Sequence, residues 1–487
     1  MGYMIVKHRS LGINSVLNII RTILTMLFPV MTFSRISRIF PIETVGMYNF
    51  ANATAGYFIM FAALGISAYA IREGAAFRDY TQRISVFSSE VFTINLFSTI
   101  AAYILLAASI LIVPRFYECR VLLMILSVNM ILMTIGCDWI HAIYEDFLYI
   151  TVRTSIIYAL ALGLFFLLVN TPDDLYTYAW ITVLATTGAQ LLNIPARRKY
   201  CSVRPVPPKR TAQHIKPILT LFANTVTTSL YVNSDQLILG FLRGDYELGL
   251  YTVAVKIYML FKSLLGAIII AITPRLSSLW ANEKDTFEEA ASRILQALLT
   301  LLVPVAVGLF FLSEPIILII ADTPYLDGIP ALRWLCASLV LSIAGWFMTS
   351  CILIPAKEEK AVLRITVIAA LANIILNFIL IPLWGFTAAA ITTVIAEGIS
   401  CILGIRRAGT LISLRKTISK TTIISILIGS ALIAAVCLWT GTWPVSPLLK
   451  ALAAFFISIP LYGIAVWLLK NPAMREASDK IRKVIKP

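Results

Sequence analysis

Four polar residues interrupt the first long apolar segment, and their spacing places them on one helical face. They recur at intervals of four, three and four residues, the period of an α-helix, and they are Asn14, Asn18, Arg21 and Thr25. If the segment spans a membrane, a rise of about 1.5 Å per residue puts Arg21 roughly 20 Å from either flank. An ionisable group near the bilayer centre costs about 2.5 to 3.5 kcal/mol. We therefore expect Arg21 to face a water-filled cavity, whereas amides and hydroxyls also suit helix packing.

A later segment repeats this spacing, with a carboxylate as the last member. Its polar residues are Asn224, Thr228, Tyr231 and Asp235. The following segment carries Lys262 deep inside and Lys256 about 10 Å from one end, where it could also snorkel to the interface. Buried cations without matching acids indicate an anionic solute such as a phosphate or diphosphate, because Arg offers forked donors and Lys a point charge. We call these two sets of polar residues the first and second polar stripes. We assign Arg21, Lys256 and Lys262 to a cationic cavity that the polar residues of both stripes line.

Acidic groups offer a means of coupling to an ion. Asp138, His141 and Glu145 follow an i, i+3, i+7 pattern, so we expect them on one face at the end of a helix, where they either relay a proton or form a solvated cluster. Glu397 lies within an apolar segment and could be protonated when desolvated, but no partner for it is evident in the sequence. Together with Asp235, these four residues are candidates for ion or proton coupling.

The elements that position these residues must be membrane helices. The 487 residues are 59% hydrophobic and 13% charged, with a mean hydropathy of +0.87, whereas soluble domains are about 25% charged. A spanning helix needs about 20 apolar residues, and about fourteen candidates occur. They are 11–33, 43–70, 88–113, 121–144, 150–169, 175–195, 215–240, 248–273, 292–312, 328–355, 361–383, 385–404, 421–440 and 446–469. The sequence predicts an all-α polytopic membrane protein, with the short run Ile316–Ile320 at the interface.

A repeat divides this array. The run Val45–Ala51 resembles Leu248–Ala254, and each opens a long apolar segment. Paired repeats are common in secondary transporters, with the solute bound between them. We predict two pseudo-symmetric six-helix lobes plus two C-terminal helices. The predicted domains are an N-terminal lobe (1–196), a basic cytoplasmic linker (197–214), a C-terminal lobe (215–405), and two further helices with a basic tail (406–487).

The charges predict orientation. With the N-terminus inside, inner segments hold 30 of the 40 basic residues and outer segments 7, so the positive-inside rule places both termini in the cytoplasm. The net charge of +15 is explained by topology and by anionic membrane lipids, and we expect no nucleic-acid partner. The seven cysteines show no metal-ligand spacing. Nucleotide, zinc-protease and hydrolase motifs are missing, so we expect no enzyme activity, metal or cofactor.

Further motifs resemble one known family. The pattern Asn373, Asn377, Leu380, Ile381, Pro382, Gly385, Ala388, Ala389, Ala390, Thr392, Thr393 and Glu397 resembles the helix 11 to 12 hallmark of the bacterial oligosaccharide-lipid flippases, the O-antigen type of the multidrug/oligosaccharidyl-lipid/polysaccharide (MOP) exporter superfamily. The segment Ser234–Lys256 is similar to its helix 7 to 8 region, and Asp138, Trp139 and Glu145 resemble one of its cytoplasmic elbows. His141 and Ala142 stand where many relatives carry Gln and Gly. We interpret Pro382 as ending helix 11 and Gly385 as turning the chain.

The resemblance implies a V-shaped pair of lobes around a cationic cavity in the bacterial inner membrane. It implies a flippase that moves an undecaprenyl-diphosphate-linked oligosaccharide, such as an O-antigen repeat unit, to the periplasmic leaflet by alternating access. H⁺ or Na⁺ would be the coupling ion, and polysaccharide assembly proteins would be partners. The alternatives are a cation-coupled multidrug antiporter of the same superfamily, whose cavity should be acidic, and a membrane glycan polymerase or ligase.

Overall fold

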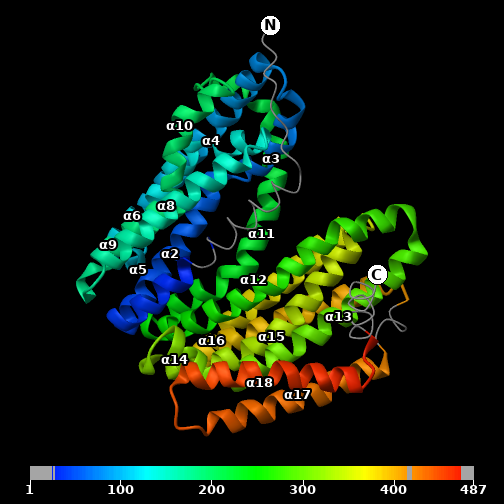
Figure 1. The fold of residues 1–487 in the computed structure, drawn as a ribbon. Helices are drawn as coiled ribbons and strands as arrows, with labels where there is room; N and C mark the ends of the chain where they lie inside the picture. The colour runs from blue at the N-terminus through cyan, green and yellow to red at the C-terminus, as the bar shows by residue number, and fades with distance from the viewer. Residues whose placement is uncertain (1–24, 26–27, 414–418, 473–487) are drawn as a thin grey trace. The chain divides into compact units, whose positions relative to one another are not determined.

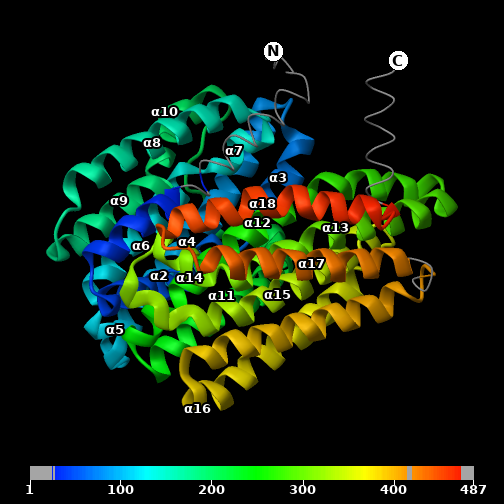
Figure 2. The same ribbon diagram turned by 60° about the horizontal axis from the view of Figure 1, so that its bottom comes forward.

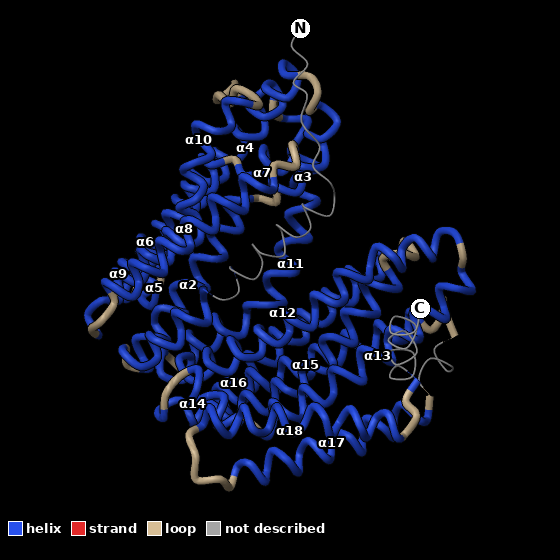
Figure 3. Tube along the Cα trace, viewed as in Figure 1, coloured by secondary structure: helices blue, strands red, loops and turns tan. Residues whose placement is uncertain are grey.

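The computed structural model describes residue 25 and residues 28–413 and 419–472, and all regular structure among them is helical (Figures 1 and 3). The chain divides into two compact units, residues 1–249 and 250–487. The all-α polytopic class predicted from composition is confirmed. The predicted domain boundaries remain predictions.

The first unit contains ten labelled α-helices and the start of an eleventh. They are α2 (Ile42–Ala63), α3 (Ile66–Gly74), α4 (Thr81–Ile112), α5 (Pro114–Glu118), α6 (Arg120–Gly136), α7 (Asp138–Ile143), α8 (Phe147–Leu168), α9 (Leu175–Thr187), α10 (Asn193–Ala196), α11 (Ala212–Leu242) and the start of α12 (Asp245–Asn282). Helix α2 packs against α4, α6 and α11. Helix α11 therefore belongs to this unit although it follows the basic linker.

The second unit continues α12 and adds the remaining helices. They are α13 (Lys284–Phe311), α14 (Ser313–Ile320), α15 (Ile329–Phe347) with a π-helical turn at Met348–Leu353, α16 (Glu359–Ala408), α17 (Lys420–Gly441) and α18 (Pro447–Leu468). Helices α15 and α16 pack together, and α17 and α18 lie side by side (Figures 1 and 2).

Within the described ranges, nine helical segments are long and apolar enough to cross a membrane, and α6 is a shorter apolar helix. Every predicted span from residue 43 onward falls on helical segments. Because the predicted spans 361–383 and 385–404 share the single helix α16, the count of fourteen is an approximation. The segment around Ile316–Ile320 forms the short helix α14.

The observed helices differ from the predicted spans at three places, two where a span is broken and one where two spans are joined. The chain has a positive φ at Leu64 and Gly65, which separate α2 from α3, and at Cys137, which separates α6 from α7. Helix α16 joins two predicted spans across a kink at Gly385, where φ is 59°. The prediction that Pro382 ends helix 11 is wrong, because the helix continues through it to Gly385, whose missing Cβ permits this conformation.

The sequence repeat corresponds to equivalent helix starts. Val45 and Leu248 are each three residues after the first residue of their helices, α2 and α12. A Cβ at Gly46 would lie 1.8 Å from the Asp245 carbonyl oxygen, and one at Gly249 would lie 2.4 Å from the Ile42 carbonyl oxygen. The two helix starts therefore cross reciprocally, and each glycine admits the backbone of the other helix.

The basic linker lies along α4 because the spacing of its alternate residues nearly equals the spacing of one turn of that helix. Backbone N–H groups of alternate linker residues donate to hydroxyls one helical turn apart, with N···O distances of 3.2, 3.2 and 2.9 Å. The pairs are Ser202 with Ser85, Arg204 with Ser89, and Val206 with Thr93. Two extended residues advance about 6.6 Å and four helical residues about 6.0 Å, so the registers agree. The linker thereby fixes where α11 begins.

Candidate functional site

The first polar stripe lies mostly outside the described residues. Asn14, Asn18 and Arg21 are among those outside, and Thr25 is half-buried. The assignment of Arg21 to a cavity therefore stays a prediction.

The second stripe lies on α11, which is continuous from Ala212 to Leu242. The Asn224 side chain is outside the description, Thr228 is exposed, Tyr231 is half-buried and Asp235 is buried. Asp235 Oδ1 accepts a hydrogen bond of 2.8 Å from the Gln236 N–H. The predicted face thus changes from exposed to buried toward its carboxylate.

The second unit holds an ion pair between Lys262 of α12 and Glu397 of α16. Lys262 Nζ donates to Glu397 Oε1 at 2.8 Å and to Tyr258 Oη at 3.1 Å. Glu397 and Tyr258 are buried, and the Lys262 side chain is 20% exposed. The expectation that Lys262 lacks a matching acid is wrong, because the fold brings Glu397 to it from 135 residues away. Lys256 is half-buried on the same helix.

The Asp138, His141 and Glu145 cluster does not share one helix face. The chain leaves α6 at Cys137, and Glu145 follows the end of α7 with a φ of 54°. Each member consequently has a different partner. Asp138 accepts from Arg153 and from Asn193, Glu145 accepts from Arg78 at 3.0 Å, and His141 Nδ1 lies 3.9 Å from Asp146 Oδ2. The structure therefore shows no proton path joining the three.

Asp146 is a titratable group that the sequence patterns did not single out. The His141 ring is the main cause that lowers the pKa of its carboxyl to about 2, and a 2.6 Å hydrogen bond from Tyr200 Oη adds to this. Asp146 thus connects the start of α8 to α7 through His141 and to the basic linker through Tyr200.

A buried hydrogen-bonded chain in the first unit was also missed by sequence reasoning. Tyr69 Oη lies 2.7 Å from His214 Nδ1, and His214 Nε2 lies 2.8 Å from Glu90 Oε2. The three residues come from α3, α11 and α4. Glu90 and His214 each adjoin an apolar segment, a weak signal, but nothing in their 124-residue separation indicates that they meet.

The hallmark residues of α16 serve its packing. Asn377 Nδ2 donates to Asn373 Oδ1 at 3.0 Å, and the Thr392 hydroxyl donates to Asn377 Oδ1 across the kink. Ala388, Ala389 and Ala390 are fully buried. Apart from Glu397, these residues fix the shape of the helix that carries the ion pair.

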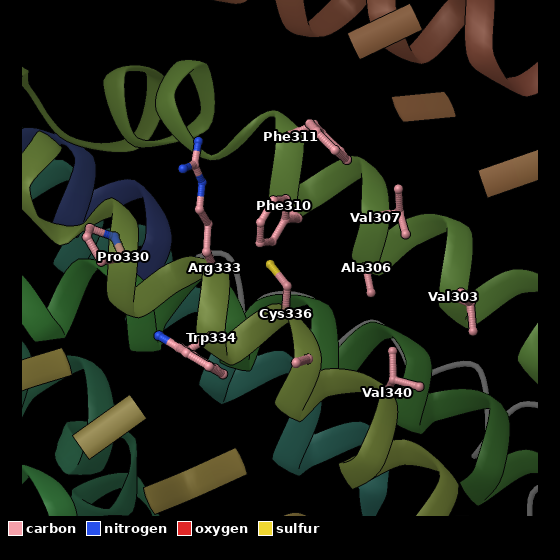
Figure 4. Close-up of a pocket in the computed structure, with 11 residues that line it drawn as sticks. Val303, Ala306, Val307, Phe310, Phe311, Pro330, Arg333, Trp334, Cys336 and Val340 are labelled. Carbon is pink, nitrogen blue, oxygen red and sulfur yellow. The ribbon is translucent and has the colours of Figure 1, made fainter. Parts of the chain in front are cut away.

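An apolar cavity of about 580 Å³ lies between α13 and α15 (Figure 4). Val303, Val307 and Phe310 line it from α13, and Val340 lines it from α15. The Arg333 guanidinium stands 5.2 Å from the Phe310 ring centroid. Such a lining suits an alkyl chain better than a sugar.

Two solved structures with a similar fold are described as a flippase and a transporter. One is described as lipid II flippase MurJ in an inward closed conformation, with a TM-score of 0.73 and 16% sequence identity, covering 96% of this chain and 99% of that one. Another is an inward-facing multidrug resistance MATE family transporter of the MOP superfamily, with a TM-score of 0.54 and 17% identity over 80% of this chain and all of that one. The fold is thus that of a polytopic membrane protein similar to these two structures.

Family comparison is more specific. Residues 11–280 match the family described as polysaccharide biosynthesis protein, and residues 221–379 match the MatE family. The chain therefore belongs to the family described as polysaccharide biosynthesis protein, in agreement with the motif resemblance.

Curated relatives match part of the chain. A "Putative O-antigen transporter" of Escherichia coli K12 is 25% identical over 255 residues, 52% of this chain and 61% of that protein. An uncharacterized membrane protein of Methanocaldococcus jannaschii is 26% identical over 308 residues, 59% of each chain. The chain spans about three fifths of the length of these curated relatives.

Proposed function

We propose that this protein is a flippase that moves an undecaprenyl-diphosphate-linked oligosaccharide, an O-antigen or similar repeat unit, from the cytoplasmic to the outer leaflet. The family assignment and the MurJ-like fold support a lipid-linked cargo. In this proposal the protein is a non-enzymatic transporter of the bacterial inner membrane, with both termini in the cytoplasm and polysaccharide assembly proteins as partners.

The Lys262 and Glu397 ion pair is the observation that carries the proposal. Within the described part of the chain, Lys262 is paired with a single carboxylate, and a diphosphate oxygen can replace that carboxylate as the partner of Lys262 Nζ. Protonation of Glu397 would favour this exchange by removing the competing charge. A transporter changes state only through differential interaction with its ligands, and exchange at this pair supplies such a difference.

The other predicted residues extend this site. Arg21 and Lys256 would add positive charge for the diphosphate. Asn14, Asn18, Thr25, Asn224, Thr228 and Tyr231 would line the passage of the sugar. Asp235 is a further candidate for ion coupling, whereas the Arg partners of Asp138 and Glu145 favour a structural role for those two.

The test uses a host whose own O-antigen flippase is deleted. Lys262→Ala should reduce surface glycan at least tenfold and leave lipid-linked repeat units on the inner leaflet, because the diphosphate loses its cation. Lys420→Ala, which removes an exposed lysine of α17, is the control. Full surface glycan with Lys262→Ala would overturn the role of the pair, and no glycan with the wild-type chain in hosts of several O-antigen types would overturn the function.

Multidrug export is the second candidate, favoured by the match to the MatE family over residues 221–379. The buried carboxylate of Asp235 would then be a candidate to bind a cationic drug. Drug resistance conferred by the wild-type chain, without restored glycan, would select this function.

A further inference from the structure

Three side chains from three helices form a continuous buried hydrogen-bonded chain in the first unit. Tyr69 of α3, His214 of α11 and Glu90 of α4 are 5%, 7% and 8% exposed. Both imidazole nitrogens are engaged, by Tyr69 Oη at 2.7 Å and Glu90 Oε2 at 2.8 Å. Phe87 packs edge-on against the ring, with centroids 5.6 Å apart. The imidazole is therefore held in place at both polar atoms and on its apolar side.

This arrangement accepts a proton without losing a hydrogen bond. With a neutral imidazole, Nε2–H donates to the Glu90 carboxylate and Nδ1 accepts from the Tyr69 hydroxyl. After proton uptake, Nδ1–H donates to the Tyr69 oxygen, whose hydroxyl hydrogen rotates away. The net charge of the three groups changes from −1 to 0. Burial makes such a change of net charge energetically consequential.

The charged residues near this chain on the elements around it lie toward the surface, including the exposed Arg204, Lys209, Arg210 and Lys216 of the linker and α11. On α3, Arg72 and Glu73 pair with each other at 2.9 Å and are exposed or partly exposed. On α4, Arg83 stacks on Tyr80. On α11, Gln213 donates to Glu90 Oε2 at 3.3 Å, and from the linker Cys201 belongs to the same buried cluster. Among the described residues, the only carboxylate that His214 contacts is thus Glu90.

A cavity reaches the chain from one side. It has a volume of about 630 Å³ and is lined by Tyr69, Glu90 and His214 together with Glu73 and Arg83. A cavity of this size with several polar groups in its wall admits water, which gives protons a route to the imidazole.

We propose that Tyr69, His214 and Glu90 form the proton-binding site through which this protein couples transport to a proton gradient. This coupling role rests on the proposed flippase function. The site differs from the Lys262 and Glu397 pair in that it binds the coupling ion and touches no cargo. Protonation changes the charge where α3, α4 and α11 meet, and it thereby biases the packing of α11, which carries Asp235.

Proton binding itself can be measured without cargo. The chain has only three histidines, His8, His141 and His214, so ¹⁵N-histidine spectra of the full-length protein in nanodiscs assign the His214 ring by its loss in His214→Gln. We expect the ring to change between neutral and protonated forms from pH 9 to pH 5. In Glu90→Gln the protonated fraction at pH 6 should fall at least threefold, whereas Gln82→Ala, on the same cavity wall, should match the wild type. A His214 ring in one form throughout, or a Glu90→Gln spectrum like the wild type, would overturn the proposal.

Coupling is measured in liposomes with a fluorescent undecaprenyl-diphosphate-N-acetylglucosamine probe. We expect an imposed pH gradient to accelerate wild-type flipping at least fivefold, and Gln82→Ala to keep this acceleration. Glu90→Gln and His214→Gln should lose it, while Tyr69→Phe, which keeps the His and Glu groups, should retain at least half. Equal wild-type rates with and without the gradient would overturn proton coupling. An absence of wild-type flipping would overturn the flippase function, and the histidine spectra would still decide whether the site binds a proton.

Discussion

The two units bury different polar centres. In the first unit, the Glu90 carboxylate faces a histidine, whose charge depends on a proton; in the second, the Glu397 carboxylate faces a lysine at 2.8 Å. Both centres end on a tyrosine hydroxyl, Tyr69 or Tyr258. The first can change its net charge by binding a proton, whereas the second keeps a cation that can exchange its anionic partner. The two units thus carry chemistry suited to two different ligands.

The strongest way to break this contrast is to remove the fixed cation. Lys262→Met should destabilise the protein by about 3 to 5 kcal/mol, because it leaves a buried carboxylate without its charged partner. The double change Lys262→Met with Glu397→Leu should recover most of that stability, since no buried charge remains, yet stay inactive. Denaturant unfolding in detergent and the surface-glycan assay measure the two properties. A double variant that restores glycan would show that the pair serves stability alone.

The shared helix starts are tested by Gly46→Ala. The added methyl group would meet the Asp245 carbonyl oxygen at 1.8 Å, and overpacking of this kind costs about 1 to 3 kcal/mol or more. Gly56 lies on the same helix with nothing within 4 Å of an added Cβ, so Gly56→Ala should be neutral or stabilising by up to about 1 kcal/mol. Thermal unfolding compares the two variants, and equal midpoints would contradict the reciprocal crossing.

Removing the carboxylate of the first centre should cost less than removing the lysine of the second. Glu90→Ala leaves the buried His214 Nε2 without its carboxylate partner, which costs about 1 to 3 kcal/mol, but the imidazole can release its proton and leave no buried charge. The same unfolding assay at pH 7.5 measures this difference. A loss equal to that of Lys262→Met would mean that His214 is held as a permanent cation.

The smallest effect concerns the second histidine–carboxylate contact, His141 with Asp146, whose carboxylate is the more exposed of the two. The folded-state pKa of Asp146 is lowered from 3.8 to about 2, so its stabilisation is present above about pH 3.8 and is lost as the pH falls through 2. Asp146→Asn should therefore lower the melting temperature slightly at pH 7 and progressively less as the pH falls from 3.8 toward 2. A difference that is constant down to pH 2 would show that the ionised carboxylate does not contribute.

The helices were predictable from the sequence, but most side-chain partners were not. Long apolar runs fix the spans from residue 43 onward, and the Val45–Ala51 repeat correctly marked two equivalent helix starts. The break at Cys137 could not be predicted, because a positive φ at a cysteine has no local signal; it is held by Arg197, whose guanidinium donates to the Ile135 carbonyl at 2.5 Å. The sequence did mark Gly385 as the turn, where the helix bends, but it placed the end of the helix too early, at Pro382.

The candidate site shows the same limit. Periodicity placed Lys262 deep in a span, but its pairing with Glu397 depends on how α12 packs against α16. The Tyr69, His214 and Glu90 chain depends in addition on the linker, whose hydroxyl contacts with α4 set the start of α11. Such contacts come from tertiary packing and not from any local pattern.

The most direct test of the account is binding of undecaprenyl diphosphate, without sugar, to the purified protein. We predict that it raises the melting temperature of the wild type and of Glu397→Gln, which keeps Lys262 and removes the competing charge, but not that of Lys262→Met. An equal rise in Lys262→Met would contradict the claim that this lysine receives the diphosphate.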